Sequence, residues 1–175
     1  MLGPIRDNKA FIFTWVCLLG ISAFFFVIAA PYVWYESSPG IPLAAGYFFV
    51  LTVIFSLMTT LTDPGIIPRK EILSKMGVKS ETLIKDAKRM CRTCGINKPP
   101  RTSHCKHCDN CIEGMDHHCP FVNNCIGKNN YRYFITFLFH VVVLGILYII
   151  GFLLHIIHES ENIGHMTPRT LKDEE

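Results

Sequence analysis

The sequence predicts an α-helical polytopic membrane protein with three transmembrane helices and a small cytosolic domain between the second and third. Half of the 175 residues are hydrophobic and the mean hydropathy is +0.30, too apolar for an ordinary soluble domain of this size. Three stretches without Asp, Glu, Lys or Arg supply the spans, at residues 10–30, 42–61 and 134–157. Each provides the roughly 20 residues that a helix needs to cross about 30 Å of hydrocarbon.

The first span has one alternative interpretation, a cleaved signal peptide, because Arg6 and Lys9 precede it and Ala29 and Ala30 end it. Its 21 mostly apolar residues exceed the apolar core of a signal peptide, which favours a retained membrane anchor. The alternative for the third span, a buried helix of a soluble core, is disfavoured by its length of 24 residues.

The distribution of charge predicts the orientation of the chain. Residues 62–133 contain 13 Lys and Arg against 7 Asp and Glu, a net charge of +6, and residues 1–9 carry +1. The connection 31–41 carries −1 and the tail 158–175 carries −3. Because positive loops stay on the cytosolic side, we expect the N-terminus and residues 62–133 to be cytosolic. The expected location is an endomembrane, either the ER or the Golgi.

The chain divides into five predicted parts. A pair of helices occupies residues 1–65 and ends at Asp63-Pro64-Gly65, where a helix breaker and a permissive glycine suit a membrane exit. A basic linker follows at 66–90, then a cysteine-rich domain at 91–133, the third helix at 134–157 and an acidic tail at 158–175.

Within the linker, the spacing predicts a short helix that begins at Ser80. Its apolar face would consist of Leu83, Ile84, Ala87 and Met90. Such a basic helix either lies on the anionic membrane surface or connects the flanking parts as a solvated linker.

Seven of the eight cysteines fall between Cys91 and Cys125, in the pattern C-x2-C-x9-H-C-x2-C-x2-C-x7-C-x5-C. Disulfides are disfavoured because the segment is predicted to be cytosolic and an odd number of thiols cannot all pair. Paired C-x2-C spacings are typical of tetrahedral zinc sites, which stabilise regions with too few apolar residues to fold alone. Two zinc sites need eight ligands from eleven candidates: Cys91, Cys94, His104, Cys105, His107, Cys108, Cys111, His117, His118, Cys119 and Cys125.

The segment Asp116-His117-His118-Cys119 contains more ionisable side chains than a metal site requires. In an extended strand, side chains alternate, so His117 and Cys119 face one way and His118 the other. His118 can then turn to a zinc ion while His117, oriented by Asp116, removes the proton of Cys119. A thiol beside such an imidazole is an activated nucleophile.

Spacing alone leaves two structural alternatives open. All of these residues can be ligands or supports of ligands, with Asp116 bonded to a ligating histidine. Cys91, Cys94, Cys105 and Cys108 can also form one all-cysteine zinc ribbon. A RING-like ubiquitin ligase is a weaker alternative, because it gives no purpose to the aspartate and histidine beside a spare thiol.

The run from Cys91 to Phe134, CRTCGINKPPRTSHCKHCDNCIEGMDHHCPFVNNCIGKNNYRYF, resembles the cysteine-rich domain of DHHC protein S-acyltransferases (palmitoyltransferases). Asp63-Pro64-Gly65 matches a second motif of that family, and Asn130 with Phe134 also fits. The resemblance implies one zinc ion on Cys91, Cys94, His104 and Cys111, and another on Cys105, Cys108, His118 and Cys125. It leaves Asp116, His117 and Cys119 for catalysis.

The resemblance further implies a two-step acyl transfer. Cys119 would attack the thioester of a long-chain acyl-CoA, and a cysteine of a cytosolic protein substrate would then attack the acyl-enzyme. Thioester exchange is nearly energy-neutral, so no ATP site is needed, and the sequence contains no phosphate-binding glycine loop. Four basic residues either meet the CoA phosphates or only enforce topology: Arg101, Lys106, Lys128 and Arg132. A nucleic-acid partner is not expected for a loop held at a membrane.

Two departures from the family pattern qualify the expected activity. Phe121 stands where the family usually has Trp, which keeps an aromatic ring at this position. Family members also usually cross the membrane four times and carry a Thr-Thr-x-Glu motif after the fourth helix, and this sequence ends before either. The alternative function is therefore a truncated, catalytically inactive zinc module, anchored in the membrane, that acts as an interaction partner.

Overall fold

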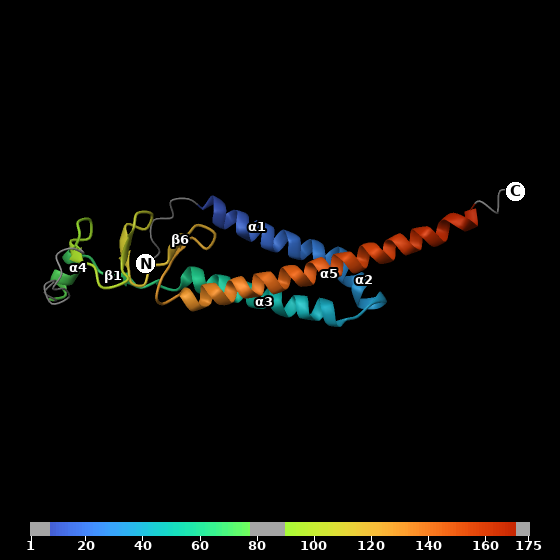
Figure 1. Ribbon diagram of the computed structural model, residues 1–175, viewed down its shortest axis with the longest axis horizontal. Helices are drawn as coiled ribbons and strands as arrows, with labels where there is room; N and C mark the ends of the chain where they lie inside the picture. The colour runs from blue at the N-terminus through green and yellow to red at the C-terminus, as the bar shows by residue number, and fades with distance from the viewer. Residues whose placement is uncertain (1–7, 78–89, 171–175) are drawn as a thin grey trace. The chain divides into compact units, whose positions relative to one another are not determined.

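The structure is a computed structural model that describes residues 8–77 and 90–170, with side chains described up to residue 163 (Figure 1). It divides into two compact units. The first consists of Met1–Trp15 and Ile54–Phe137, and the second of Val16–Val53 and Leu138–Glu175. The predicted helix that begins at Ser80 lies outside the described residues, apart from its last member, Met90.

Within the described residues, three helices are long and apolar enough to cross a membrane: Lys9–Glu36, Gly40–Leu61 and Tyr131–Ile163. This confirms the predicted number of spans and the predicted fold class. The first span is continuous but not uniform, because α1 (Lys9–Phe24) passes through the π-helical turn η1 (Phe25–Ala29) into α2 (Ala30–Glu36). A turn of three residues, 37–39, then leads into α3 (Gly40–Leu61).

The third long helix differs from the prediction at both ends. α5 runs from Tyr131 to Thr170, whereas the apolar stretch predicted residues 134–157. The helix therefore continues through the first part of the acidic tail, because hydropathy reports the part of a helix that suits lipid and not where its hydrogen bonding ends.

The second unit is held together by small and aromatic residues of the three helices. Its core contains Phe25, Ala29, Ala30, Ala45, Leu144 and Tyr148. The rings of Phe25 and Tyr148 stack with centroids 4.5 Å apart, and the Tyr148 hydroxyl donates a hydrogen bond of 2.8 Å to Ser22 Oγ. Gly151 has no side chain at the point where a Cβ atom would lie 2.5 Å from Phe25 Cε2. Close approach at small residues is the usual way in which membrane helices pack.

The first unit contains all the strands of the described chain, which are short and pair in three antiparallel sheets. β1 (Ile66–Ile67), β5 (Asn110–Ile112) and β4 (Ser103–Cys105) form one sheet in that order. β2 (Met90–Cys91) pairs with β3 (Ile96–Asn97), and β6 (His117–Cys119) pairs with β7 (Asn124–Ile126).

Of the helix that the apolar spacing predicted in the linker, the structure describes only Met90. Met90 was predicted to lie on its apolar face, but it begins β2 opposite Asn97, and this part of the prediction is wrong. The described part of the linker contains instead α4 (Lys70–Lys75), whose Leu73 is buried against Cys94 and Ile96. Pairing with the next strand, β3, outweighs the helical spacing at Met90.

The exit from α3 is built by the Asp63-Pro64-Gly65 motif. Asp63 Oδ1 accepts hydrogen bonds from the backbone N–H groups of Gly65 and Ile66, at 2.7 and 2.9 Å, which turns the chain into β1. Gly65 has a positive φ of 107°, a conformation that favours glycine, and its carbonyl accepts a hydrogen bond from the Glu113 N–H. The motif thus ties the end of a membrane helix to the chain directly after β5.

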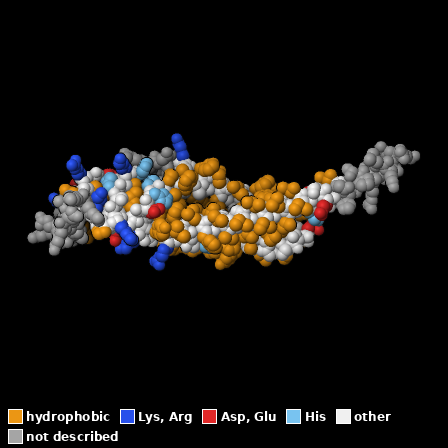
Figure 2. Space-filling view, in the orientation of Figure 1, with side chains coloured by type: hydrophobic (Ala, Val, Ile, Leu, Met, Phe, Trp, Pro, Cys, Tyr) orange, Lys and Arg blue, Asp and Glu red, His pale blue; other side chains and the backbone are white. Residues whose placement is uncertain are grey.

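Figure 2 shows hydrophobic side chains over the long helices, while lysine and arginine side chains gather over the part of the chain that contains the strands. Exposed apolar residues recur along all three long helices, among them Phe13, Val50 and Val142. This distribution is the one expected of helices that face lipid and of a strand region that faces water.

Candidate functional site

The first cluster of cysteine and histidine side chains forms between two hairpins. Cys91 and Cys94 flank the turn after β2, where Gly95 takes a positive φ of 66° and its N–H donates to the Cys91 carbonyl. His104 and Cys111 face each other across β4 and β5. His104 Nδ1 lies 3.5 Å from Cys91 Sγ, 3.4 Å from Cys94 Sγ and 3.9 Å from Cys111 Sγ.

The second cluster repeats this plan. Cys105 and Cys108 flank a turn at the end of β4, and His118 faces Cys125 across β6 and β7. His118 Nδ1 lies 3.4 Å from Cys108 Sγ and 3.6 Å from Cys125 Sγ, and the two sulfurs are 3.4 Å apart. In each cluster one C-x2-C turn thus meets one histidine and one cysteine that are cross-strand neighbours.

Both clusters have the dimensions of a tetrahedral metal site. All four ligand atoms of each cluster lie within 4.8 Å of one another. With Zn–S bonds of about 2.3 Å and Zn–N bonds of about 2.0–2.1 Å, tetrahedral ligand atoms are about 3.5 to 3.8 Å apart. The distances from the histidine nitrogens to the sulfurs, 3.4 to 3.9 Å, fit that geometry.

These clusters decide between the alternatives that spacing left open. Cys91 and Cys94 belong to one cluster, and Cys105 and Cys108 belong to the other. A single all-cysteine ribbon is therefore excluded. The two clusters contain the same residues that the family resemblance implied as ligands.

The thiols of each cluster shift one another's pKa values. Burial, together with hydrogen bonds to Cys91 and Cys94, raises the pKa of the Cys111 thiol. In the second cluster, the hydrogen bond from the Cys125 thiol lowers the pKa of Cys108 to about 5 and raises that of Cys125. A bound divalent cation would favour the thiolate form of every cysteine in a cluster, because its charge stabilises all of the thiolates at once.

An aspartate that the sequence analysis did not select supports the first cluster. Asp109 Oδ1 lies 3.5 Å from His104 Nε2, the ring nitrogen that faces away from the sulfurs. Its other carboxylate oxygen lies 2.5 Å from the Arg69 guanidinium. A carboxylate on the second nitrogen of a ligating histidine sets the ring orientation and the tautomer. The one signal in the sequence was its place directly after Cys108. The structure puts it in a left-handed turn with a φ of 52°.

Cys119 belongs to neither cluster among the described residues. It is the last residue of β6, only 6% exposed, and packs in a hydrophobic group with Val122, Ile126 and Phe137, to which Phe55 and Phe134 add partly buried rings. The prediction that residues 117–119 are extended is confirmed. Cys119 thus belongs to a hydrophobic cluster to which side chains from α3 and the start of α5 contribute.

The adjacent pair of Asp116 and His117 lies toward water. His117 Nδ1 is 2.7 Å from Asp116 Oδ2, and the His117 ring contacts the Phe134 ring edge to face at 5.3 Å. In the neutral imidazole, an N–H at Nδ1 donated to Asp116 leaves Nε2 as the proton acceptor. Neither residue is part of a metal cluster in the described chain. His107, also outside the clusters, stacks on His118 at 4.8 Å.

Two asparagines, which the sequence analysis did not assign to the site, connect this region to the end of α3. The side-chain NH2 of Asn124 lies 3.1, 3.1 and 2.9 Å from the carbonyl oxygens of Thr59, Thr60 and Thr62. Asn130 is fully buried, donates to the carbonyls of Thr59 and Cys125, and accepts a hydrogen bond from the N–H of residue 127. The local sequence around Asn124 gave no indication that its amide reaches a helix more than sixty residues earlier.

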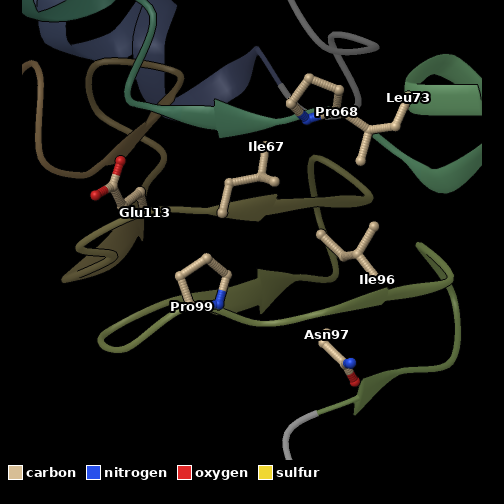
Figure 3. Close-up of a pocket in the computed structure, with 7 residues that line it drawn as sticks. All are labelled: Ile67, Pro68, Leu73, Ile96, Asn97, Pro99 and Glu113. Atoms are coloured by element: carbon tan, nitrogen blue, oxygen red, sulfur yellow. The ribbon is translucent and has the colours of Figure 1, made fainter. Parts of the chain in front are cut away.

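A separate cavity of about 280 Å³ opens in the cysteine-rich region (Figure 3). Its lining is mostly apolar and comes from β1, β3, α4 and the adjoining loops: Ile67, Pro68, Leu73, Ile96, Asn97, Pro99 and Glu113. Neither Cys119 nor His117 lines it, so the cavity is separate from both residues.

Comparison with known proteins agrees with this geometry. The family model described as DHHC palmitoyltransferase matches residues 84–172, which include both clusters, Cys119 and all of α5. The chain belongs to the DHHC palmitoyltransferase family. The resemblance seen in the sequence is thereby confirmed.

Individual palmitoyltransferases match over most of this chain. Palmitoyltransferase ZDHHC8 of Mus musculus is 37% identical over 159 residues, covering 84% of this chain and 20% of the relative. Palmitoyltransferase ZDHHC14 of Homo sapiens is 35% identical over 191 residues, covering 96% of this chain and 39% of the relative. Palmitoyltransferase ZDHHC9 of Danio rerio is 35% identical over 192 residues, covering 96% and 49%. The chain therefore spans between a fifth and a half of the length of these DHHC palmitoyltransferases.

Proposed function

We propose that this chain transfers a long-chain acyl group from acyl-CoA to cysteine thiols of cytosolic proteins, through a thioester on Cys119. The observation that carries the proposal is the position of the Cys119 sulfur. It lies outside both four-residue clusters of the described chain, on the same strand as His117, whose ring is held by Asp116. Membership of the DHHC palmitoyltransferase family supports this reaction class.

The two clusters are proposed to hold two structural zinc ions. Cys91, Cys94, His104 and Cys111 would hold one, and Cys105, Cys108, His118 and Cys125 the other. Bound zinc supplies folding free energy to a region whose strands are only two or three residues long. It also commits the electron pairs of the cluster thiolates to the metal, so that they compete less with Cys119 as nucleophiles.

The chemistry of the first step is a balanced exchange of thioesters. His117 Nε2 takes the Cys119 proton, the Cys119 sulfur forms a bond to the acyl carbonyl carbon, and the bond from that carbon to the CoA sulfur breaks. The proton held by His117 passes to the departing CoA thiolate. In the second step, His117 takes the proton of a substrate cysteine and the substrate sulfur forms a bond to the acyl carbon. The bond from that carbon to the Cys119 sulfur breaks, and the proton returns to the Cys119 thiolate. Neither step needs an oxidant or ATP.

The surroundings of Cys119 suit a long-chain acyl donor. Phe55, Phe134 and Phe137 contribute apolar surface to the hydrophobic cluster that contains Cys119, at the ends of two helices that can cross a membrane. By the charge distribution, this end faces the cytosol, so the CoA group stays in water while the acyl chain enters the lipid side. Burial at about 0.8 kcal/mol per CH2 favours long chains. The ER or Golgi membrane is the proposed location.

The proposal is tested by incubating the purified, zinc-loaded chain with a clickable long-chain acyl-CoA and then with hydroxylamine, which cleaves thioesters. A hydroxylamine-sensitive label is expected on the parent chain and on Cys17→Ser, and no label on Cys119→Ser. Absence of label from a folded, zinc-loaded parent chain would contradict the proposal. That result would favour the alternative of a membrane-anchored zinc module that acts as an interaction partner.

A further inference from the structure

The end of α3 has an unusual set of hydrogen-bond donors. The last carbonyl groups of an α-helix have no partner within the helix, and near lipid they are costly to leave unpaired. The amide of Asn124 approaches three carbonyls in this region, those of Thr59, Thr60 and Thr62. An amide has two N–H hydrogens, so the three acceptors share them.

The backbone of the same asparagine faces Cys119. Asn124 and Cys119 are directly opposite in the β6–β7 hairpin. One residue therefore bonds the end of α3 through its side chain and pairs with the proposed nucleophile through its backbone. Asn130 provides a second connection from the same helix end, since its amide donates to both Thr59 and Cys125.

We propose that Asn124 is a positioning residue that fixes where the Cys119 sulfur lies relative to the end of α3. This inference rests on the proposed acyl transfer and adds a residue to it that does not touch the reacting atoms. The acyl carbonyl must reach the Cys119 sulfur while the acyl chain lies among the helices. The sulfur therefore has to stay at a fixed distance from the ends of the helices. A misplacement of about 1 Å can slow such a reaction about a hundredfold.

The competing explanation is that Asn124 only stabilises the fold as a helix cap. The two explanations differ in what the loss of the amide changes. If Asn124 is only a helix cap, loss of its amide lowers the stability of the fold but leaves the rate of acyl-enzyme formation in folded molecules unchanged. A positioning residue slows acyl-enzyme formation at saturating acyl-CoA, while the acyl-CoA concentration at half-saturation and the zinc content stay close to those of the parent.

The test compares Asn124→Ala and Asn124→Asp with Asn123→Gly in the full chain. Asn124→Asp keeps the volume of the side chain but removes its N–H donors. Asn123→Gly is the matched control, because Asn123 is on the same hairpin, its amide contacts Asn8 at 3.4 Å, and its φ of 49° is one that glycine accepts. Both Asn124 variants are expected to form the acyl-enzyme about tenfold to a hundredfold more slowly, with both zinc ions retained and Asn123→Gly unchanged.

A second measurement does not depend on acyl transfer. In a zinc-loaded Cys17→Ser background, Cys119 is alkylated with a water-soluble and with a lipid-soluble maleimide. The ratio of the two rates is expected to change about tenfold in Asn124→Ala and to stay constant in Asn123→Gly. If the parent chain forms no acyl-enzyme, the proposed function fails, and this ratio alone decides the positioning role. An unchanged ratio, or loss of zinc from both Asn124 variants, would overturn the inference.

Discussion

Nδ1 of His117 lies 2.7 Å from Oδ2 of Asp116, and neither residue belongs to a metal cluster in the described chain. A carboxylate at this distance holds the imidazole in one tautomer and stabilises the imidazolium that forms when it accepts a proton. A carboxylate–imidazole pair thus lies directly before His118, which is a member of the second cluster. The different roles proposed for His117 as a base, His118 as a metal ligand and Cys119 as the nucleophile lead to the first prediction.

His117→Ala is expected to slow acyl-enzyme formation about a hundredfold to ten-thousandfold, because general-base catalysis contributes about that much. Asp116→Asn is expected to slow it as well, since the amide can present the wrong hydrogen-bonding group to His117. Single-turnover labelling with clickable acyl-CoA measures both rates. Wild-type rates in both variants would show that Cys119 needs no neighbouring base.

Loss of a proposed ligand should have a different signature from loss of the base. Cys91→Ala is expected to release zinc and reduce the amount of folded protein, because metal binding supplies the folding free energy of the region. His117→Ala is expected to retain both zinc ions. Metal analysis of both purified variants makes the comparison, and equal zinc loss would mean that the ligand assignment is wrong.

Asp109 provides a prediction about metal affinity. Asp109→Asn keeps the left-handed turn but removes the carboxylate that faces His104 Nε2 and the Arg69 guanidinium. Loss of such an outer partner weakens metal binding by about tenfold to a hundredfold. Competition with a chromophoric chelator measures the change. Glu113→Gln is the control, because its ion pair with Lys128, at 2.7 Å, involves no residue of either cluster.

Gly151 tests the packing of the helices in the second unit. A Cβ atom at Gly151 would lie 2.5 Å from Phe25 Cε2, whereas one at Gly145 on the same helix would meet nothing within 4 Å among the described residues. Gly151→Ala is therefore expected to destabilise the unit by about 1–3 kcal/mol, the usual cost of overpacking. Gly145→Ala should be neutral or slightly stabilising. Thermal unfolding in detergent measures both, and equal midpoints would contradict this account of the packing.

Much of the architecture was predictable from local features of the sequence. Hydropathy identified three spans because crossing lipid requires a continuous apolar segment, a property of neighbouring residues. Treating residues 117–119 as an extended strand predicted that His118 alone of the three turns to a metal site. The structure has a strand there, and His118 is the only one of the three in a cluster of the described chain. The prediction that Met90 lies on a helix was wrong, because pairing with Asn97, and not the local spacing, decides the conformation of this residue.

The sequence by itself determined which residue types are available for metal binding and acyl transfer, where the chain can cross a membrane, and the family to which it belongs. The family resemblance also implied how the cysteines are shared between two clusters, and the structure brings those residues together. Only the tertiary structure decided that Asp109 supports His104 and that Asn124 joins the strand of Cys119 to the end of α3. The physical reason is that hydropathy and strand alternation are properties of neighbouring residues. Ligand clusters and helix caps instead depend on strand pairing and turns that bring distant parts of the chain together.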